Sequence, residues 1–446
     1  MMPQATLREY ETGSVPIECS GWVPASRAIP TYDPVQSDID ADVVVIGAGL
    51  TGASTALHLA ERKLNVVVLE ARQPAWGASG RNAGIVLPFL LGSLEELQSW
   101  PDQGRRFVDT FVANRNIVFE VCTRHGIDGD AEQSGFLQLA RRPSAKPGLE
   151  REARPWKKFG YDVELVGAEG LRELTGSNVY QIGLRWRDGG RVNPFLFTNG
   201  MITAAIRLGC RVFGGSPVTA CEKSGERWLV RTANGSVRTQ KVILCTNGHR
   251  NNTFFPELAA TNYPLVACGL ATKPLSEALL KQINPSGIAL EQFPTALFPL
   301  VIDGRKRLLT STIPGPWQAQ RASLYMSYFR RYLRRTYPQL DLDEIELESY
   351  WTGMTESSSS KYHYDYPKIY DLAPGVTALA NLGTWGNVLG PLLGMNFAQA
   401  LVSERPGDLM LPVERPCAVK SPKAFEWKIR YVLIPLARVA DRLGFL

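Results

Sequence analysis

The sequence is poor in the residues that build metal sites, disulfide frameworks and nucleophilic triads. Its 446 residues include four histidines and seven cysteines, and no two cysteines form a CxxC pair. An odd number of cysteines without such pairs argues against a disulfide framework or a zinc site, and favours a reducing, cytoplasmic compartment. The chain shows no Ser/His/Asp order and no metal-ligand spacing, so neither a triad nor a bound metal is predicted.

Long apolar runs and basic stripes are also missing. No apolar run reaches the roughly 18 residues that a membrane-spanning helix needs. The first residues, MMPQATLREYETG, lack the basic start and apolar core of a secretory signal. The net charge of +6 is modest for this length, and acids are interleaved with the basic residues, so no nucleic-acid partner is predicted. Apolar and charged fractions of 44% and 21% are those of an ordinary globular protein.

A glycine-rich turn carries the first positive signal. Residues 42–71, DVVVIGAGLTGASTALHLAERKLNVVVLEA, indicate a buried strand, a tight turn, a helix and a second buried strand. Gly47, Gly49 and Gly52 form GxGxxG in the turn, where they allow a pyrophosphate to approach the backbone at the helix N-terminus. Glu70 ends the second strand, where an acid accepts hydrogen bonds from a ribose hydroxyl. This unit predicts a dinucleotide that contains adenosine.

The loop that follows bears on which dinucleotide is bound. It reads WGASGRNAG, residues 76–84, and six of its nine residues are Gly, Ala or Ser. A nicotinamide-binding fold would normally continue into another crossover helix. A thin, polar loop suits a backbone that runs beside a flat ring system, which favours a flavin, and the alternative is an ordinary surface loop.

These motifs resemble the FAD-dependent D-amino-acid oxidase/glycine oxidase (DAO) superfamily, above all its gamma-glutamylputrescine-oxidase-like amine oxidases. The resemblance continues at RDGGRVNP (187–194), VILCTNGH (242–249) and GTWGNVLGPLLG (383–394), and it covers about residues 38–402. It implies an α/β (α+β mixed) fold with a Rossmann-like FAD-binding domain. A discontinuous second domain would be built on an antiparallel or mixed β-sheet.

The resemblance divides the chain into two discontinuous domains and two terminal segments. The FAD-binding domain would comprise residues 41–95, 185–255 and 350–402, and the substrate-binding domain residues 96–184 and 256–349. Residues 1–40 are predicted as an extended N-terminal arm and residues 403–446 as a C-terminal helical segment. This last segment mixes apolar and basic residues, so peripheral contact with a membrane and packing within the protein or against a second protomer both stay open.

The family's cofactor contacts, carried onto the matching positions, imply that FAD is held by six separate segments. They comprise Gly47, Gly49, Leu50, Thr51, Gly52, Glu70, Ala71, Arg72, Ser79, Arg81, Asn82, Ala83, Val218, Thr246, Asn247, Gly248, Gly386, Asn387, Val388 and Leu389. A helix that begins near Gly386 would point its N-terminus at the flavin pyrimidine ring. A helix N-terminus stabilises the negative charge that reduction places there.

The substrate side is carried by aromatic residues and one cation. The candidate catalytic and pocket residues are Trp351, Lys361, Tyr366, Trp385 and Asn387, which suit an amine beside a carboxylate or amide. For the Tyr-rich stretch 350–367, a surface loop is the alternative. Two departures from the family fall on this side: Asn387 stands where many relatives have His, and Thr310-Ser311 where they have paired glycines.

The resemblance implies a flavin enzyme that oxidises a primary or secondary amine, either an amino acid or a gamma-glutamyl-amine-like compound. The amine would become an imine by hydride transfer to flavin N5, and reoxidation by O2 would give H2O2. One alternative is a dehydrogenase that passes electrons to a quinone or a carrier protein. Another is an FAD-binding protein without amine oxidase activity. The sequence leaves the oligomeric state open.

Overall fold

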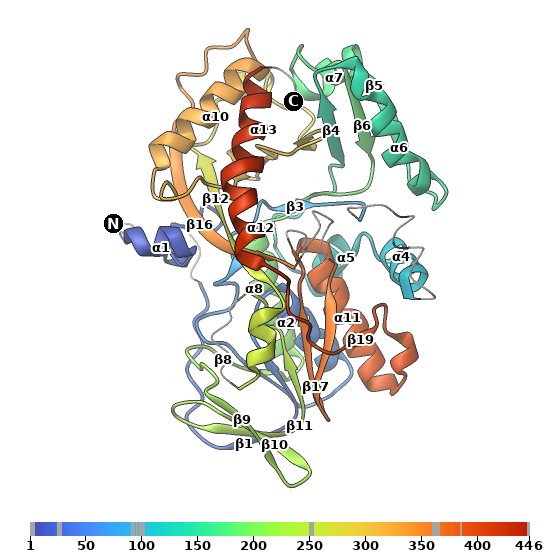
Figure 1. Ribbon diagram of the computed structural model, residues 1–446, viewed down its shortest axis with the longest axis vertical. Helices are drawn as coiled ribbons and strands as arrows, with labels where there is room; N and C mark the ends of the chain where they lie inside the picture. The colour runs from blue at the N-terminus through green and yellow to red at the C-terminus, as the bar shows by residue number, and fades with distance from the viewer. Residues whose placement is uncertain are drawn as a thin grey trace.

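Two β-sheets organise the chain, one in each half of the molecule (Figure 1). The computed structural model describes residues 5–24, 29–90, 94, 97, 103–248, 254–358, 366–383 and 386–443. One sheet has nine strands and the other has eight. Together they confirm the predicted mixed α/β fold, in which the second domain is built on a mixed β-sheet.

The nine-stranded sheet is built around the predicted nucleotide-binding unit. Its centre is β1 (Ile39–Ile46), which pairs in parallel with β2 (Val66–Leu69) on one side and β11 (Ser236–Leu244) on the other. All four residues of β2 are buried, as expected for a parallel strand that is covered on both faces. The other strands are β8 (Arg211–Phe213), β9 (Ala220–Ser224), β10 (Arg227–Arg231), β17 (Lys368–Ala373), β18 (Val376–Ala380) and β19 (Val413–Glu414).

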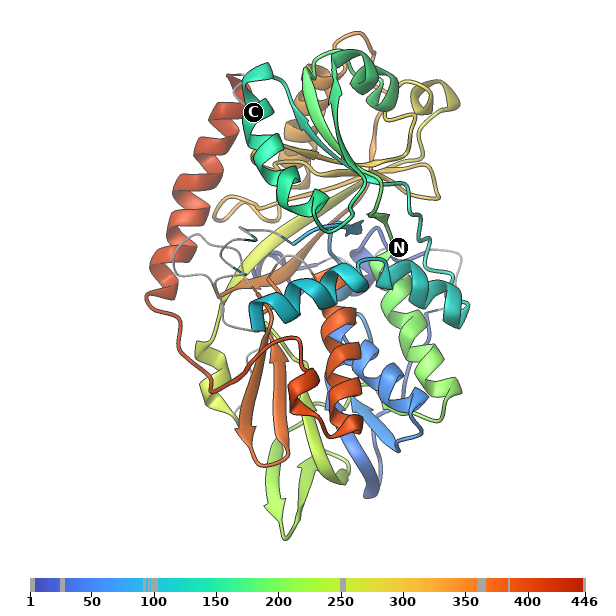
Figure 2. The same cartoon turned by 90° about the vertical axis from the view of Figure 1, so that its right-hand side faces the viewer.

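Three helices pack together beside this sheet (Figure 2). They are α2 (Leu50–Glu61), α8 (Pro194–Arg207) and α11 (Gly386–Ser403). The predicted order of strand, turn, helix and strand over residues 42–71 is therefore confirmed. Because α2 is rich in Ala, Gly, Ser and Thr, both α8 and α11 lie close against it.

The eight-stranded sheet runs in the order β16-β12-β15-β14-β13-β4-β6-β5 and is antiparallel except where β13 pairs with β4. One face packs on α10 (Ala322–Thr336), which buries Tyr325, Phe329 and Leu333. The strands are β4 (Phe136–Ala140), β5 (Val163–Gly167), β6 (Ile182–Trp186), β12 (Tyr263–Thr272), β13 (Ala289–Gln292), β14 (Leu300–Ile302), β15 (Leu308–Thr312) and β16 (Leu347–Ser357).

Short elements connect the two halves. A two-stranded pairing of β3 (Ile85–Val86) with β7 (Gly190–Arg191) lies between the sheets. The smaller helices are α1 (Leu7–Thr12), α4 (Gln103–Ala113), α5 (Ile117–His125), α6 (Lys146–Lys157), α7 (Ala168–Thr175) and α9 (Glu277–Leu280). The segment 1–40, predicted as an extended arm, thus includes α1, and its Trp22 is buried in the main core.

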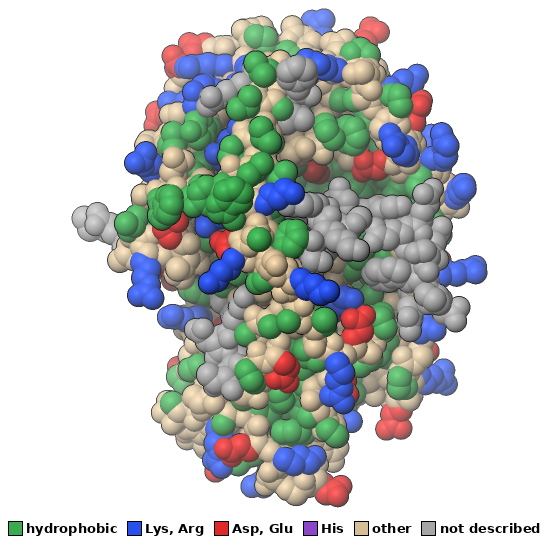
Figure 3. Space-filling model, in the orientation of Figure 1, with side chains coloured by type: hydrophobic (Ala, Val, Ile, Leu, Met, Phe, Trp, Pro, Cys, Tyr) green, Lys and Arg blue, Asp and Glu red, His purple; other side chains and the backbone are tan. Residues whose placement is uncertain are grey.

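The C-terminal segment ends in helix. The helix α12 (Pro422–Lys428), a π-helical turn (Ile429–Leu433) and α13 (Ile434–Arg442) run as one continuous rod along the outside of the molecule (Figures 1 and 2). Hydrophobic side chains gather over its course on the surface (Figure 3). Of the helices in the described ranges, none has both the length and the apolar character to span a bilayer.

Candidate functional site

The turn from β1 into α2 forms a cradle of backbone N–H groups. Gly47 has a φ of 101°, a region that favours glycine. A Cβ on Gly52 would lie 1.9 Å from the carbonyl oxygen of Gly47, so no larger residue fits there. Gly49 caps α2 without a side-chain hydrogen bond. The N-terminal amides of α2 therefore face a ligand site with the positive end of the helix dipole.

One buried polar atom in this cradle has no hydrogen-bond partner within the described residues. The atom is Thr51 Oγ1. Next to it, Ser79 Oγ accepts from the Leu50 N–H at 2.9 Å. An unsatisfied hydroxyl in the first turn of a helix is the arrangement that a bound phosphate oxygen would complete.

The carboxylate of Glu70 closes the same end of β2. Its Oε2 accepts from the Ala48 N–H at 2.7 Å, and its Oε1 accepts from the Arg72 N–H at 2.9 Å. Burial raises the pKa of Glu70, and these backbone donors oppose that rise. Both oxygens keep lone pairs, so the position suits the predicted hydrogen bond to a ribose hydroxyl.

The loop of residues 76–84 is fixed from behind through its carbonyl oxygens. The indole of Trp351 donates to Arg81 O at 2.9 Å, and the indole of Trp22 donates to Asn82 O at 2.7 Å. A hydroxyl, Ser20 Oγ, donates to Gly80 O at 3.1 Å. The carbonyl edge of the loop thus faces the protein, and the predicted pocket residue Trp351 lies behind the loop.

Arg81 braces this loop with its whole guanidinium group. It donates to Trp76 O at 2.8 Å, Val15 O at 2.6 Å and Thr352 O at 3.2 Å. Burial lowers the pKa of Arg81 to about 10, so the side chain stays cationic at neutral pH. Its side chain is engaged inside the protein, which leaves the backbone as the part able to meet a cofactor.

A pair of amides joins the loop to the first turn of α11. Asn82 Nδ2 donates to Asn387 Oδ1 at 3.0 Å, and Asn387 Nδ2 donates back to Asn82 Oδ1 at 2.9 Å. Asn387 Nδ2 also donates to Ile85 O at 2.9 Å. The residue that replaces the family's His is therefore occupied in holding loop and helix together.

Glycines bring the start of α11 against the start of α2. A Cβ on Gly394 would lie 2.7 Å from both Thr51 O and the Thr55 N–H nitrogen, and a Cβ on Gly390 would lie 3.1 Å from Leu50 Cβ. The two helix N-termini and the loop 76–84 consequently converge on one place.

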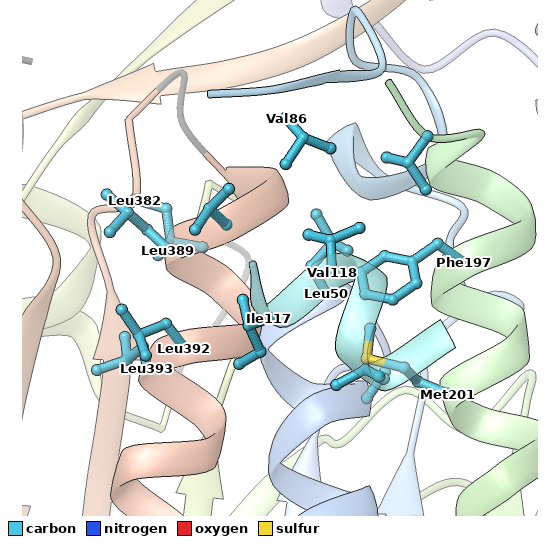
Figure 4. Packing of buried hydrophobic residues seen from close by; sticks show 14 of the residues in the cluster. Leu50, Val86, Ile117, Val118, Phe197, Met201, Leu382, Leu389, Leu392 and Leu393 are labelled. Atoms are coloured by element: carbon cyan, nitrogen blue, oxygen red, sulfur yellow. The ribbon is translucent and has the colours of Figure 1, made fainter. Parts of the chain in front are cut away.

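Apolar members of the predicted cofactor set point into the core. Leu50, Val388 and Leu389 are almost fully buried in the main cluster, where Leu50 and Leu389 lie among side chains of several helices (Figure 4). Any contact that these three residues make with a cofactor must therefore come from their backbone.

The other residues predicted to contact the cofactor lie next to strands of the nine-stranded sheet or in the loop 76–84. Ala71 and Arg72 are exposed after β2, Val218 is half-buried before β9, and Ala83 is half-buried in the loop. Thr246, Asn247 and Gly248 follow β11, and Asn247 Oδ1 accepts from the Asn381 N–H at 2.8 Å.

Tyr366, a predicted substrate-side residue, is buried before β17, with its ring edge-on to the ring of Phe107 at a centroid distance of 6.0 Å. Lys361 and Trp385 lie outside the described residues.

Strand register shows which face of the eight-stranded sheet meets the loop. Trp351 stands opposite Gly269, and Gly269 opposite Ser311. Directly paired residues share a face, and so do residues two apart along a strand. Followed across β15, β14 and β13, this rule puts Glu291 on the face of Trp351, whose indole contacts the loop.

A buried polar cluster that sequence reasoning missed lies on this face. Glu291 pairs in register with Gln138, whose Nε2 donates to Glu152 Oε1 at 2.8 Å and whose Oε1 accepts from Trp186 Nε1 at 3.1 Å. Burial and the neighbouring Glu152 raise the pKa of Glu291 to about 8, although part of its side chain remains accessible. The signal in the sequence was an acid that directly follows the apolar run IAL, residues 288–290.

The cradle, the orphaned Thr51 hydroxyl, the Glu70 carboxylate and the converging helix N-termini fit a dinucleotide that carries a flavin. A family model named DAO, described as FAD dependent oxidoreductase, matches residues 42–400. The gamma-glutamylputrescine oxidoreductase of Escherichia coli (strain K12) is 30% identical over 330 residues, which cover 72% of this chain and 75% of that protein.

Solved structures share the fold at low sequence identity. The glycine oxidase from Bacillus cereus ATCC 14579 gives a TM-score of 0.64 at 19% identity, over 82% of this chain and 95% of that one. The L-amino acid deaminase from Proteus vulgaris with its specific insertion sequence deleted gives 0.68 at 19% identity, over 91% and 98%. These likenesses concern the fold.

Proposed function

Because the chain belongs to the DAO family of FAD-dependent oxidoreductases, we propose that it oxidises a primary or secondary amine to an imine, which water then hydrolyses. The structural observation that carries the proposal is the convergence of the N-termini of α2 and α11 on the loop 76–84. The cofactor predicted from the sequence, FAD, is confirmed by the family match.

The roles of the chain's own residues follow from this geometry. FAD, when bound, supplies a two-electron acceptor for the hydride on the carbon that bears the amine nitrogen. The first amides of α2 would neutralise the pyrophosphate, and the first turn of α11 would stabilise negative charge on the reduced ring. The amine loses a hydride and a proton as it becomes an imine, and transfer of the two electrons to O2 would yield H2O2.

The substrate we propose carries an amine together with an amide or carboxylate, in the manner of a gamma-glutamyl amine. Support comes from the relative of 30% identity, whose name specifies gamma-glutamylputrescine. Glu291 is the proposed binding group for the amine end, because it lies on the sheet face that meets the loop. With a pKa raised to about 8, its carboxyl is suited to exchange a proton with an alkylammonium, which must be neutral to react.

The first test is an anaerobic titration of the purified holoenzyme, followed by the flavin absorbance band. Gamma-glutamyl diamines are expected to bleach the band, and air is expected to restore it with release of peroxide. Recovery with a quinone but not with air would replace the oxidase with a dehydrogenase. A band that no amine or amino acid bleaches would overturn the proposal and leave an FAD-binding protein without this activity.

The role of Glu291 is tested by a matched pair of variants. At a pH above about 8, where the Glu291 carboxyl is ionised, Glu291→Gln is expected to raise the amine concentration needed for half-reduction at least about tenfold, because it removes one charge–charge contact. Glu150→Gln is the control, since this residue lies on α6 near Glu152 but has a side chain that is 45% exposed. If both variants needed the same amine concentration for half-reduction, Glu291 would not bind the amine.

A further inference from the structure

The helical rod of α12 and α13 carries its apolar side outward. Exposed residues recur every fourth position at Trp427, Tyr431, Pro435, Val439 and Leu443. Four-residue spacing aligns side chains in one row along a helix. Leu436, between Pro435 and Val439, lies beside the row and is 61% exposed. We call this row, with Leu436, the apolar ridge.

Aromatic rings widen the ridge at its start. Trp427 stacks on Tyr431 with ring centroids 5.7 Å apart, and Trp317 meets Tyr431 edge-on at 6.2 Å. Trp317 comes from a different part of the chain and is 75% exposed. Three neighbouring aromatic rings on the surface are costly in water, and Trp and Tyr are the residues that favour a membrane–water interface.

Two polar groups of α13, on Arg438 and Asp441, point inward and fasten the rod to the protein. Arg438 donates to Ile313 O at 2.7 Å, and its guanidinium lies over the rings of Tyr325 and Tyr328. Asp441 forms an ion pair with Arg335 of α10. The apolar side is therefore held facing outward by specific contacts on the opposite side.

Charge along the rod decides between two occupants. Residues 416–446 contain six Lys or Arg and two acids, Glu426 and Asp441, and each acid is paired with an arginine. Lys420, Lys423 and Lys428 are exposed at the aromatic end. A second copy meeting this face about a two-fold axis would bring basic segments together, which costs free energy. Anionic headgroups would instead complement them, at about 1 kcal/mol for each basic residue near the surface.

We propose that the apolar ridge docks the protein on an anionic lipid surface. The helix lies on the outside of the molecule, and hydrophobic side chains gather along its course (Figures 1 and 3). Trp427, Tyr431 and Leu436 enter the interface, and the lysines at the aromatic end contact the headgroups. This inference does not depend on the identity of the oxidised amine.

The test is co-sedimentation of the holoenzyme with lipid vesicles. One set contains phosphatidylcholine alone, and the other contains equal amounts of phosphatidylcholine and phosphatidylglycerol. The protein is expected to sediment with the anionic vesicles and to be released by high salt. The double variant Leu436→Asp/Val439→Asp is expected to weaken this binding at least about tenfold, because charges at an apolar interface are costly.

Matched variants separate the ridge from general surface effects. Val402→Asp/Val413→Asp changes two exposed apolar residues elsewhere, which are 41% and 49% exposed, and is expected to bind as the wild type does. Lys423→Glu/Lys428→Glu is expected to lose the preference for anionic vesicles, whereas Lys157→Glu/Lys158→Glu is expected to keep it. Flavin absorbance checks that each variant is folded.

Two outcomes would overturn the proposal. One is equal sedimentation of the wild type with and without anionic lipid. The other is a wild-type dimer in light scattering that Leu436→Asp/Val439→Asp converts to a monomer, because a second copy would then occupy the ridge. Vesicle binding is read out without an amine, so it stands or falls separately from the oxidase activity.

Discussion

For polar residues in and near the loop 76–84, the neighbouring groups decide what each side chain binds. Arg81 and Asn82 stand in a thin loop and were predicted to contact the cofactor. The structure engages the Arg81 guanidinium with three carbonyl oxygens and the Asn82 amide with Asn387. Glu291 shows the reverse case, since an unremarkable strand residue becomes a carboxyl whose pKa is raised by burial and by Glu152.

The raised pKa of Glu291 predicts a pH-dependent stability. Between the usual pKa of a glutamate and about 8, the folded chain keeps a proton that the unfolded chain releases, so stability falls as the pH rises through this window. Glu291→Gln removes this loss. We expect the free energy of unfolding of this variant, relative to wild type, to gain up to about 1.4 kcal/mol per pH unit across the window.

Denaturant unfolding at a series of pH values measures this difference. Glu150→Gln, with its more exposed side chain, is expected to show a flat difference over the same range. If the stability difference between Glu291→Gln and wild type also stayed constant with pH, burial and Glu152 would not raise the pKa of Glu291.

At the scale of elements, close helix contact creates the site. The glycines of α11 allow it to lie against α2, and this contact brings both N-termini to the loop. Gly49, the residue before α2, has no side chain that could cap the first amides of that helix. Small residues therefore serve both the packing and the binding of an anionic group.

A methyl group at Gly394 is expected to push these helices apart. Its Cβ would lie 2.7 Å from backbone atoms of Thr51 and Thr55, which cannot move without shifting α2. Gly394→Ala is expected to lower stability by about 1–3 kcal/mol and to lower the fraction of protein that retains FAD. Thermal unfolding and the ratio of flavin to protein absorbance measure both effects.

The control for this variant lies on the same helix. Gln399 is exposed on α11, so Gln399→Ala is expected to leave stability and flavin content near wild type. If Gly394→Ala also had no effect, the close approach of α2 and α11 would not be what positions the cofactor.

At the scale of the molecule, one buried cation joins three distant segments. Arg81 binds carbonyl oxygens near the N-terminus, in its own loop and in β16 of the eight-stranded sheet. Trp351 and Trp22 reinforce the same junction with their indole N–H groups. The two halves are thus connected directly behind the loop that would carry the flavin.

Loss of this brace is expected to loosen both halves together. Arg81→Met leaves three carbonyl oxygens without their donor, at a cost on the order of 2–4 kcal/mol. We expect an earlier thermal transition and release of FAD at a lower temperature, measured by circular dichroism and flavin fluorescence. Arg105→Met, at a site where the side chain is 85% exposed, is the control. Unchanged FAD release in Arg81→Met would contradict this role.

The sequence by itself determined the strand–turn–helix unit, the cofactor class and the family, because these depend on local patterns. The GxGxxG motif between two β-branched runs can be recognised within a segment of about 30 residues. The positions of the substrate-side residues do not follow from such local patterns, and Lys361 and Trp385 fall outside the described residues.

Only the tertiary structure decided which distant residues meet. The amides of Asn82 and Asn387 pair across 305 positions of sequence, and no local pattern encodes that contact. The face on which Glu291 lies follows from the register of five paired strands. Whether the C-terminal helix turns its apolar side inward or outward depends on Arg438 and Asp441 finding partners in remote segments. The sequence of a helix determines which of its sides is apolar, and contacts with the rest of the protein determine whether that side faces inward or outward.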